Sequence, residues 1–265
     1  MHLSNPGNPR LKEVQKLEKH AHRKATGLFS VEGLREINLA FKAGYEFDKI
    51  FICEEKIKET ESYNLNFLKI IADDKVNTVS EAAYDAIAYR GSTEGIVAVL
   101  KQKEHSLNDL ALPENPLLLV IEGVEKPGNL GAMLRTADAV GVDAVLLCDM
   151  GTDLYNPNVI RSGIGTVFTN KIAVDSTRNI IDFLKQKKIT TYAASLQAKK
   201  IYYEFDYRKP IAFVVGEEAN GLSALWQSNA DEKLIISMNG TIDSLNVSVS
   251  AAVLLYEALR QRKVF

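Results

Sequence analysis

Three hydrophobic segments, each running straight into a loop of small and polar residues, place the strongest constraint on the fold of this chain. They cover residues 120–129, 214–222 and 236–250. In open α/β sheets, ligands bind beyond the carboxyl ends of the strands, so we expect the three loops to meet at one pocket. The chain has 265 residues, of which 46% are hydrophobic, enough to fill the cores of one large domain or two ordinary ones.

The last of these segments leads into an expected helix. Apolar residues recur with helical spacing over residues 251–262, and Ser244, Asn246 and Ser248 precede them. Side chains of this type cap helices by accepting hydrogen bonds from the first free backbone N–H groups. The same N–H groups and side-chain oxygens could hold a polar ligand, so the local sequence leaves a cap and a binding site equally open.

A polar stretch at residues 106–116, which includes Pro113 and Pro116, divides the chain. We therefore expect two domains, residues 1–105 and residues 117–265, joined by this linker. Upstream of the linker, helical and strand patterns alternate, which predicts a small α/β sandwich. The expected elements are a helix from Pro9, a helix over residues 34–43, and strands at residues 29–32, 49–53, 76–79 and 96–100.

Basic residues are concentrated near the start of the chain. Arg10, Lys12, Arg23 and Lys24 belong to a group that outnumbers the acidic residues around it. Such a patch attracts a phosphate backbone through counterion release, and a solvated helix face is an equally open explanation. The formal net charge of the whole chain is −2, so no global basic field draws in nucleic acid.

Taken in order, the three loops resemble the three motifs of the SpoU (TrmH-type) RNA 2′-O-ribose methyltransferases of the SPOUT superfamily. The resemblance spans residues 115–265 and is most specific at the Ser-Leu-Asn-Val-Ser run of residues 244–248. It implies a mostly parallel sheet with a deep trefoil knot, whereas chain-connection rules alone favour an unknotted doubly wound fold. Residues 5–40 are similar to the substrate-binding domain that precedes the catalytic domain in many members. That domain looks like a ribosomal-protein type of RNA binder.

The resemblance implies four catalytic positions, which are Asn129, Arg135, Glu218 and Asn246. Arg135 would lie on a helix that begins at Asn129, about 140° around the helix axis from the apolar stripe that contains Leu130. A ribose 2′-hydroxyl is a weak nucleophile that must lose its proton as it attacks a methyl donor, and a nearby guanidinium favours the alkoxide. Whether Arg135 takes the proton or only stabilises charge is left open.

The resemblance also implies S-adenosylmethionine as the cofactor. Its expected binding residues are Gly216, Ile236, Met238, Ser244 and Leu245. Arg161 and Ser162 are added to the basic residues near the start of the chain as expected RNA contacts. No metal site is expected, and the sequence contains no glycine motif of a dinucleotide or P-loop site.

Family members usually dimerise through the C-terminal domain, so the resemblance implies a homodimer. The last helix would then divide its apolar positions between the core and the interface, and these positions are Val249, Val253, Leu254 and Ala258. Cys53 and Cys148 each lie in an apolar run, which indicates buried thiols in a reducing compartment. No stretch has the length and apolarity of a membrane span, so we expect a cytoplasmic protein without membrane partners.

These observations together predict an enzyme that transfers a methyl group from S-adenosylmethionine to a ribose 2′-hydroxyl, with large-subunit ribosomal RNA as the substrate and no DNA partner. Transfer RNA is the alternative substrate within the same family. The alternative from another class is a non-catalytic RNA-binding protein that uses the knotted domain as a dimerisation platform. The presence of all four implied catalytic residues favours the enzyme.

Overall fold

The computed structural model of the chain describes residues 1–57, 60–61, 63–89, 94–217 and 221–263, and it divides into two compact units. The first unit consists of Met1–Glu104 and Asp153–Thr169, and the second consists of His105–Thr152 and Asn170–Phe265. Residues 153–169 fall within the expected C-terminal domain of residues 117–265. In the structure this segment packs with the first unit.

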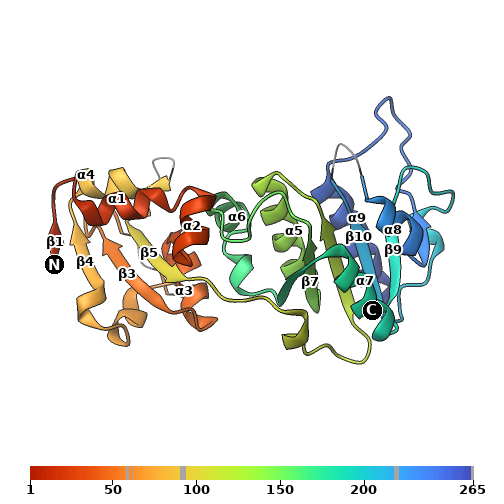
Figure 1. Ribbon diagram of the computed structural model, residues 1–265, viewed down its shortest axis with the longest axis horizontal. Coiled ribbons are helices and arrows are strands. Elements are labelled where there is room, and N and C mark those ends of the chain that lie inside the picture. The colour runs from red at the N-terminus through yellow and green to blue at the C-terminus, as the bar shows by residue number, and fades with distance from the viewer. Residues whose placement is uncertain (58–59, 62, 90–93, 218–220, 264–265) are drawn as a thin grey trace. The chain divides into compact units, whose positions relative to one another are not determined.

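The first unit is built on a five-stranded mixed sheet in the order β1-β4-β3-β5-β2, in which β5 runs antiparallel to both neighbours (Figure 1). Its strands are β1 His2–Leu3, β2 Leu28–Glu32, β3 Phe47–Ile52, β4 Val76–Val79 and β5 Ile96–Lys101. Its helices are α1 Pro9–Lys16, α2 His20–Thr26, α3 Leu34–Lys42, α4 Glu81–Ile87 and α6 Pro157–Ser162, with short 3-10 turns at Leu65–Lys69, Asp73–Lys75 and Thr166–Phe168. The mixture of helices and strands predicted for this part of the chain is therefore confirmed.

The helices α1 and α4 lie side by side and cover one face of this sheet (Figure 1). The buried side chains of Leu11 and Val14 on α1 are spaced one turn apart and pack with Val97 and Val99 of β5. Asn8 caps α1, since its side-chain oxygen accepts the backbone N–H of Arg10 at 2.9 Å. The helix predicted from Pro9 is thus confirmed at its first residue.

The segment of residues 153–169 is attached to the first unit by aromatic and ionic contacts. The ring centroid of Tyr155 lies 4.2 Å from that of Phe29, and its hydroxyl lies 3.1 Å from the hydroxyl of Tyr45. Burial raises the pKa of both tyrosines. Asp153 forms an ion pair with Arg23. Because buried aromatic contacts contribute much of a small core, this segment is an integral part of the first unit.

The second unit is a six-stranded sheet in the order β11-β9-β10-β6-β7-β8, and all of its strand pairs are parallel. The strands are β6 Leu117–Glu122, β7 Ala144–Cys148, β8 Ile172–Asp175, β9 Thr190–Ala194, β10 Ile211–Val215 and β11 Glu232–Leu234. The helices are α5 Pro127–Val140, α7 Thr177–Gln186, α8 Ala224–Asn229 and α9 Val247–Arg262, with 3-10 turns at Leu107–Asp109 and Tyr202–Glu204. The expected mostly parallel sheet is confirmed.

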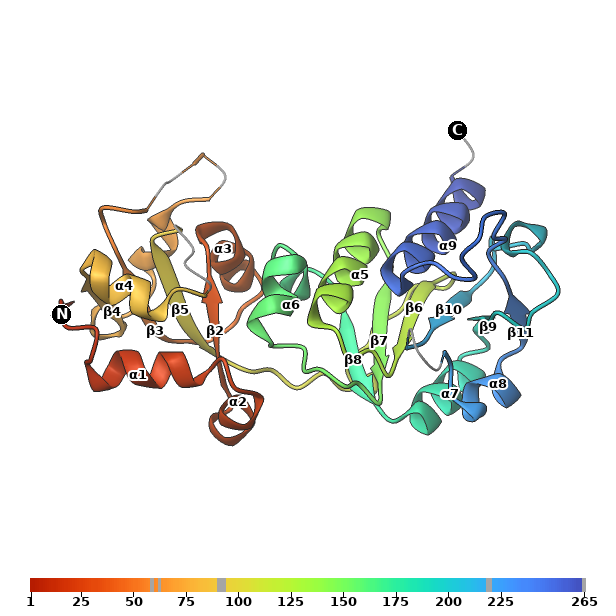
Figure 2. The same cartoon turned by 90° about the horizontal axis from the view of Figure 1, so that it is seen from above.

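Helices cover both faces of the parallel sheet, with α7 and α8 on one side and α5 and α9 on the other (Figure 2). Successive residues of a strand point to opposite faces, so Leu118 and Val120 of β6 pack toward Ile180 of α7 and Trp226 of α8. All residues of β6 are buried, as expected for a central strand of a parallel sheet.

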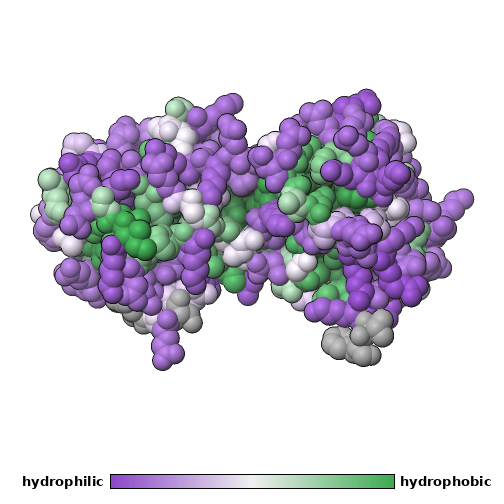
Figure 3. Space-filling view, turned by 90° about the horizontal axis from the view of Figure 1, so that it is seen from below, coloured by the Kyte–Doolittle hydropathy of each residue, from purple (hydrophilic) through white to green (hydrophobic). Residues whose placement is uncertain are grey.

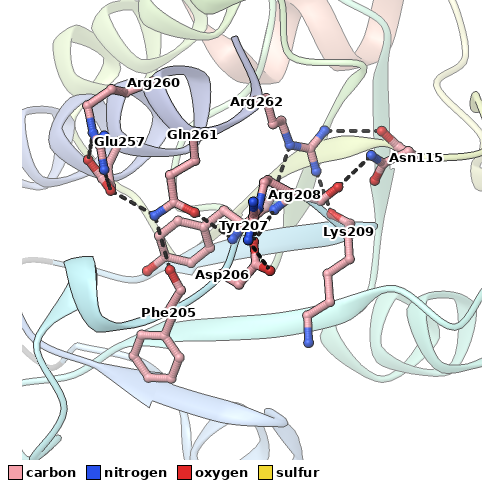
Figure 4. A network of polar contacts seen from close by, with 10 residues as sticks. All are labelled: Asn115, Phe205, Asp206, Tyr207, Arg208, Lys209, Glu257, Arg260, Gln261 and Arg262. Atoms are coloured by element: carbon pink, nitrogen blue, oxygen red, sulfur yellow. Dashed lines mark hydrogen bonds and ion pairs between the residues drawn. The ribbon is translucent and has the colours of Figure 1, made fainter. Parts of the chain in front are cut away.

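The last turn of α9 is fixed to the loops at the amino ends of the strands (Figure 4). The guanidinium of Arg262 donates hydrogen bonds to the carbonyl oxygens of Tyr207 at 2.8 Å, of Lys209 at 2.6 Å, and of Asn115 and Pro116 at 3.1 Å each. Burial lowers the pKa of the Arg262 guanidinium. The orientation of α9 is thereby set from its C-terminal end.

In both units, polar residues lie mostly at the surface and the cysteines are buried. Hydrophilic residues cover most of the face drawn in Figure 3 in each unit. Cys53 and Cys148 are free and buried, as the sequence indicated. Among the residues that the structure describes, no helix has the length and apolarity needed to cross a membrane.

Candidate active site

A pocket of about 560 Å³ opens in the second unit at the carboxyl ends of β9, β10 and β11, next to the first turn of α9. All five expected cofactor residues line this pocket, namely Gly216, Ile236, Met238, Ser244 and Leu245. Asn246 lines it as well. The structure therefore brings together residues that lie up to 30 positions apart in the sequence.

Gly216 allows the two ends of one pocket loop to approach each other closely. A Cβ atom at this position would lie 2.6 Å from the carbonyl oxygen of Gly221 and 2.8 Å from the backbone nitrogen of Leu222. Both distances are below van der Waals contact with backbone atoms that cannot move aside easily. A larger residue at Gly216 would therefore displace Gly221 and Leu222, which also line the pocket.

Asn246 joins the start of α9 to the start of α5. Its side-chain oxygen accepts the backbone N–H of Ser248 at 2.9 Å, which makes it the N-cap of α9. Its amide nitrogen donates to the side-chain oxygen of Asn129 at 3.2 Å. Of the two roles that the sequence left open, the structure assigns the cap to Asn246 and also places this residue at the pocket.

Arg135 projects from the exposed side of α5, as its angle from Leu130 predicted. Within the described residues its side chain makes no hydrogen bond or ion pair, and it is not among the pocket-lining residues. It lies six residues beyond Asn129, about 9 Å further along the helix axis. The helix begins two residues earlier than expected, at Pro127, because proline is well suited to the first helical position.

The fourth expected catalytic residue, Glu218, lies outside the described residues. Its neighbour Glu217 is half-buried and lines the pocket, and the backbone oxygen of Glu217 accepts the N–H of Gly221 at 2.9 Å. The pocket therefore has at least one acidic side chain next to the position of Glu218.

Sequence reasoning missed a fourth strand end at this pocket. Part of its wall is formed by Ala194, the last residue of β9, and by Ser195, Leu196 and Gln197, which follow it. The segment has the same build as the three loops that were recognised, a short apolar strand that ends in small and polar residues. Lys126, which belongs to the first of the three loops expected to meet here, also lines the pocket. Gln227 lines it as well and was not expected there.

The expected RNA contacts lie in the first unit, and they differ in exposure. Arg10, Lys12 and Lys24 are exposed. Arg23 is only 1% exposed, and its guanidinium is occupied by Asp153 and by the carbonyl oxygens of Leu17 and Glu18. The expectation that Arg23 contacts RNA is therefore corrected, because a buried, paired guanidinium cannot reach a phosphate.

The other two expected RNA contacts belong to α6 and therefore to the first unit. Arg161 is exposed in the last turn of this helix. The hydroxyl of Ser162 donates to the carbonyl oxygen of Asn158 at 2.6 Å, so it is engaged within its own helix.

The comparison with known proteins agrees with this arrangement. The family model described as the SpoU rRNA Methylase family matches residues 116–256, and the one described as an MRM3-like substrate binding domain matches residues 8–98. A parallel sheet with a pocket at the carboxyl ends of its strands is typical of α/β proteins that bind a small ligand. The match to the family model shows to which family of such proteins the chain belongs. The chain belongs to the SpoU rRNA methylase family.

Three proteins are similar to this chain over nearly their whole length. The chain is 30% identical to the 23S rRNA (guanosine(2553)-2′-O)-methyltransferase RlmP of Bacillus subtilis, covering 96% of this chain and 97% of the relative. A crystal structure of an RNA 2′-O ribose methyltransferase superimposes with a TM-score of 0.84 at 40% identity, covering 99% of each chain. An AdoMet-bound rRNA methyltransferase from Sinorhizobium meliloti gives a TM-score of 0.87 at 26% identity, covering 98% of this chain and 97% of that one.

Proposed function

We propose that this protein transfers a methyl group from S-adenosylmethionine to a ribose 2′-hydroxyl of large-subunit ribosomal RNA. The observation that carries the proposal is the convergence of all five expected cofactor residues on one pocket, in a chain that matches the SpoU family model over residues 116–256. The relative from Bacillus subtilis is a 23S rRNA 2′-O-methyltransferase.

The pocket fits a cofactor with an adenine ring and a charged amino-acid end. Its volume of about 560 Å³ lies within the usual range for small-molecule sites. Leu222, Ile236 and Leu245 supply apolar walls, and Glu217 and Asp243 supply carboxylates suited to the positive charges of the cofactor. When bound, S-adenosylmethionine would supply an activated methyl group.

Arg135 is proposed as the catalytic arginine, and Asn129, Asn246 and Glu218 as residues that orient groups around it. An exposed guanidinium is free to contact an incoming RNA and can pair with a phosphate through two parallel hydrogen bonds. Next to the 2′-hydroxyl it would favour loss of the proton by stabilising the developing negative charge.

We assign RNA binding to the first unit. Arg10, Lys12 and Lys24 are exposed cations, and Arg161 adds a further exposed cation from α6. The match of residues 8–98 to a substrate-binding domain supports this assignment. Neutralising exposed cations one at a time should lower RNA affinity and flatten its dependence on salt concentration, because fewer counterions are released.

The proposal includes a trefoil knot and a homodimer. The knot is supported by the similarity to the crystal structure of an RNA 2′-O ribose methyltransferase, which superimposes with a TM-score of 0.84 over 99% of each chain. The homodimer is supported by exposed apolar side chains on α9, with Val249 at 45% and Tyr256 at 51% exposure. Two buried free thiols agree with a location in the cytoplasm.

The deciding experiment is transfer of radiolabelled methyl from S-adenosylmethionine to total RNA from a strain that lacks this gene, followed by separation by size and alkaline digestion. Label in alkali-resistant dinucleotides from large-subunit RNA supports the proposal. The same product from transfer RNA would reassign the substrate. Absence of label together with absence of cofactor binding by calorimetry would favour the non-catalytic RNA-binding protein.

A further inference from the structure

A buried carboxylate lies at the end of the central strand β6. Glu122 is the last residue of this strand, follows five buried apolar residues and is 5% exposed. Its Oε2 atom accepts the backbone N–H of Ser223 and its Oε1 atom accepts the hydroxyl of Ser223, both at 2.8 Å. The hydroxyl of Thr177 lies 2.8 Å from Oε1 as well. A buried carboxylate is strongly destabilising unless hydrogen-bond donors face it, and Ser223 supplies two of them, its backbone N–H and its hydroxyl.

Through Ser223, this carboxylate is connected to the wall of the pocket. Ser223 is the N-cap of α8, and its hydroxyl oxygen accepts the backbone N–H of Trp226 at 3.4 Å. The two residues before Ser223, Gly221 and Leu222, line the pocket. Because one buried side chain accepts both the backbone N–H and the hydroxyl of Ser223, Glu122 attaches this end of the wall to β6.

The same carboxylate is connected to two further segments. Thr177 is the first residue of α7, and its hydroxyl also lies 2.5 Å from the Oδ2 atom of Asp149, directly after β7. Along its own chain, Glu122 is followed by the short loop that leads to Lys126 and Asn129. Glu122 is therefore hydrogen-bonded to the residue next to the pocket wall, and it also begins the loop that leads to Asn129.

We propose that Glu122 is a positioning residue of the methyl-transfer reaction, which sets the place of Gly221 and Leu222 relative to the loop that precedes Asn129. This inference rests on the proposed function of the pocket. Glu122 does not line the pocket formed by the described residues, so it acts through Ser223 rather than by contact with the cofactor. Its loss should weaken cofactor binding more than it slows the chemical step.

The test compares three variants in the full-length protein. Glu122→Gln keeps one acceptor oxygen. It replaces the other with an amide group, whose N–H would face one of the Ser223 donors. Ser223→Ala removes the hydroxyl bond but keeps the backbone bond. Asp231→Asn is the matched control, because Asp231 also accepts a backbone N–H and a hydroxyl, both from Thr191, at 2.9 and 2.7 Å. Those bonds lie at the amino end of β9, away from the carboxyl ends that form the pocket.

We expect Glu122→Gln to raise the KM for S-adenosylmethionine roughly tenfold and Ser223→Ala about threefold, with kcat within about twofold of wild type. Asp231→Asn should change neither constant. If Glu122→Gln does not fold, the KM of Ser223→Ala decides. A lower kcat at unchanged KM, or kinetic constants that match those of Asp231→Asn, would overturn the proposal.

A readout without cofactor separates this proposal from the proposed function. Trp226 is the single tryptophan of the chain, is 0% exposed, and its indole N–H has no hydrogen-bond partner in the described structure. Glu122→Gln should shift its emission to the red and speed amide hydrogen exchange in residues 221–230, unlike Asp231→Asn. If wild type binds no cofactor, the proposed function fails, and these two signals alone decide whether Glu122 positions the wall.

Discussion

The amide nitrogen of Asn246 lies 3.2 Å from the side-chain oxygen of Asn129, across 117 positions of sequence. This hydrogen bond joins the first turn of α9 to the first turn of α5 at the edge of the pocket. Asn246 uses its other side-chain atom to cap α9, so one residue both starts a helix and fixes an expected catalytic side chain.

Two substitutions of Asn246 should separate these two roles. Asn246→Asp keeps the oxygen that accepts from Ser248 but loses the amide donor, so the contact re-forms only if Asn129 turns its own amide around. We expect unchanged thermal stability and methyl transfer reduced at least tenfold. Asn246→Ala removes the cap as well and should cost about 1 kcal/mol of unfolding free energy. Thermal denaturation measures the stability of the two variants, and a methyl-transfer assay measures their activity. Full activity of Asn246→Asp would contradict the expected role of the contact with Asn129.

Arg135→Ala should abolish most methyl transfer without affecting the fold. Its side chain is exposed and unpaired within the described residues, so the unfolding free energy should change by less than about 0.5 kcal/mol. Loss of a charge-stabilising group at a reacting oxygen typically lowers kcat by roughly 100-fold or more. Arg178→Ala, an exposed arginine on α7, is the control and should keep wild-type turnover. Equal turnover by both variants would remove Arg135 from the mechanism.

Gly216→Ala should weaken cofactor binding because its Cβ would lie 2.6 Å from the carbonyl oxygen of Gly221. The displaced backbone belongs to the pocket wall, so we expect at least a tenfold increase in the Kd for S-adenosylmethionine by calorimetry. Gly240→Ala is the matched control, since nothing lies within 4 Å of a Cβ there. The prediction fails if the two variants bind the cofactor equally well.

Arg262→Ala should destabilise the second unit far more than Arg260→Ala. Arg262 donates to four carbonyl oxygens, which would be left without these partners, and we expect a loss of roughly 2–4 kcal/mol in urea unfolding. Arg260 is paired with Glu257 and has 70% of its side chain exposed, so its contribution to the free energy of unfolding should be small. Figure 4 shows both arginines on the same turn of α9. Similar losses for the two would mean that the Arg262 network adds little to stability.

Cys148 should make the stability fall at alkaline pH. Burial raises the pKa of its thiol from 9.0 to about 11. Below pH 9 the thiol is neutral in both the folded and the unfolded chain, so its ionisation does not yet lower the free energy of unfolding. Between pH 9 and pH 11 it ionises only in the unfolded chain, and stability should fall by about 2 kcal/mol. Urea unfolding at pH 8 and pH 10.5 should show a smaller drop for Cys148→Ala than for wild type, and identical drops would contradict the assignment.

The sequence by itself determined the elements and the composition of the site. Hydrophobic runs that end in glycine and asparagine predicted β6 and β10, and Ser244 to Ser248 predicted a helix start that Asn246 indeed caps. These features are local, because strand burial, turn chemistry and capping depend on neighbouring residues. The motif pattern was also specific enough to indicate the family that the comparison confirmed.

Only the tertiary structure decided which distant residues meet and which cations are free. Arg23 and Lys24 are adjacent in sequence, yet one is buried against Asp153 and the other is exposed. The pairing of Asn129 with Asn246 and the hydrogen bonds from Ser223 to Glu122 depend on the order of strands in the sheet. Such contacts cannot be read from periodicity, because long-range packing selects among side chains that look alike locally.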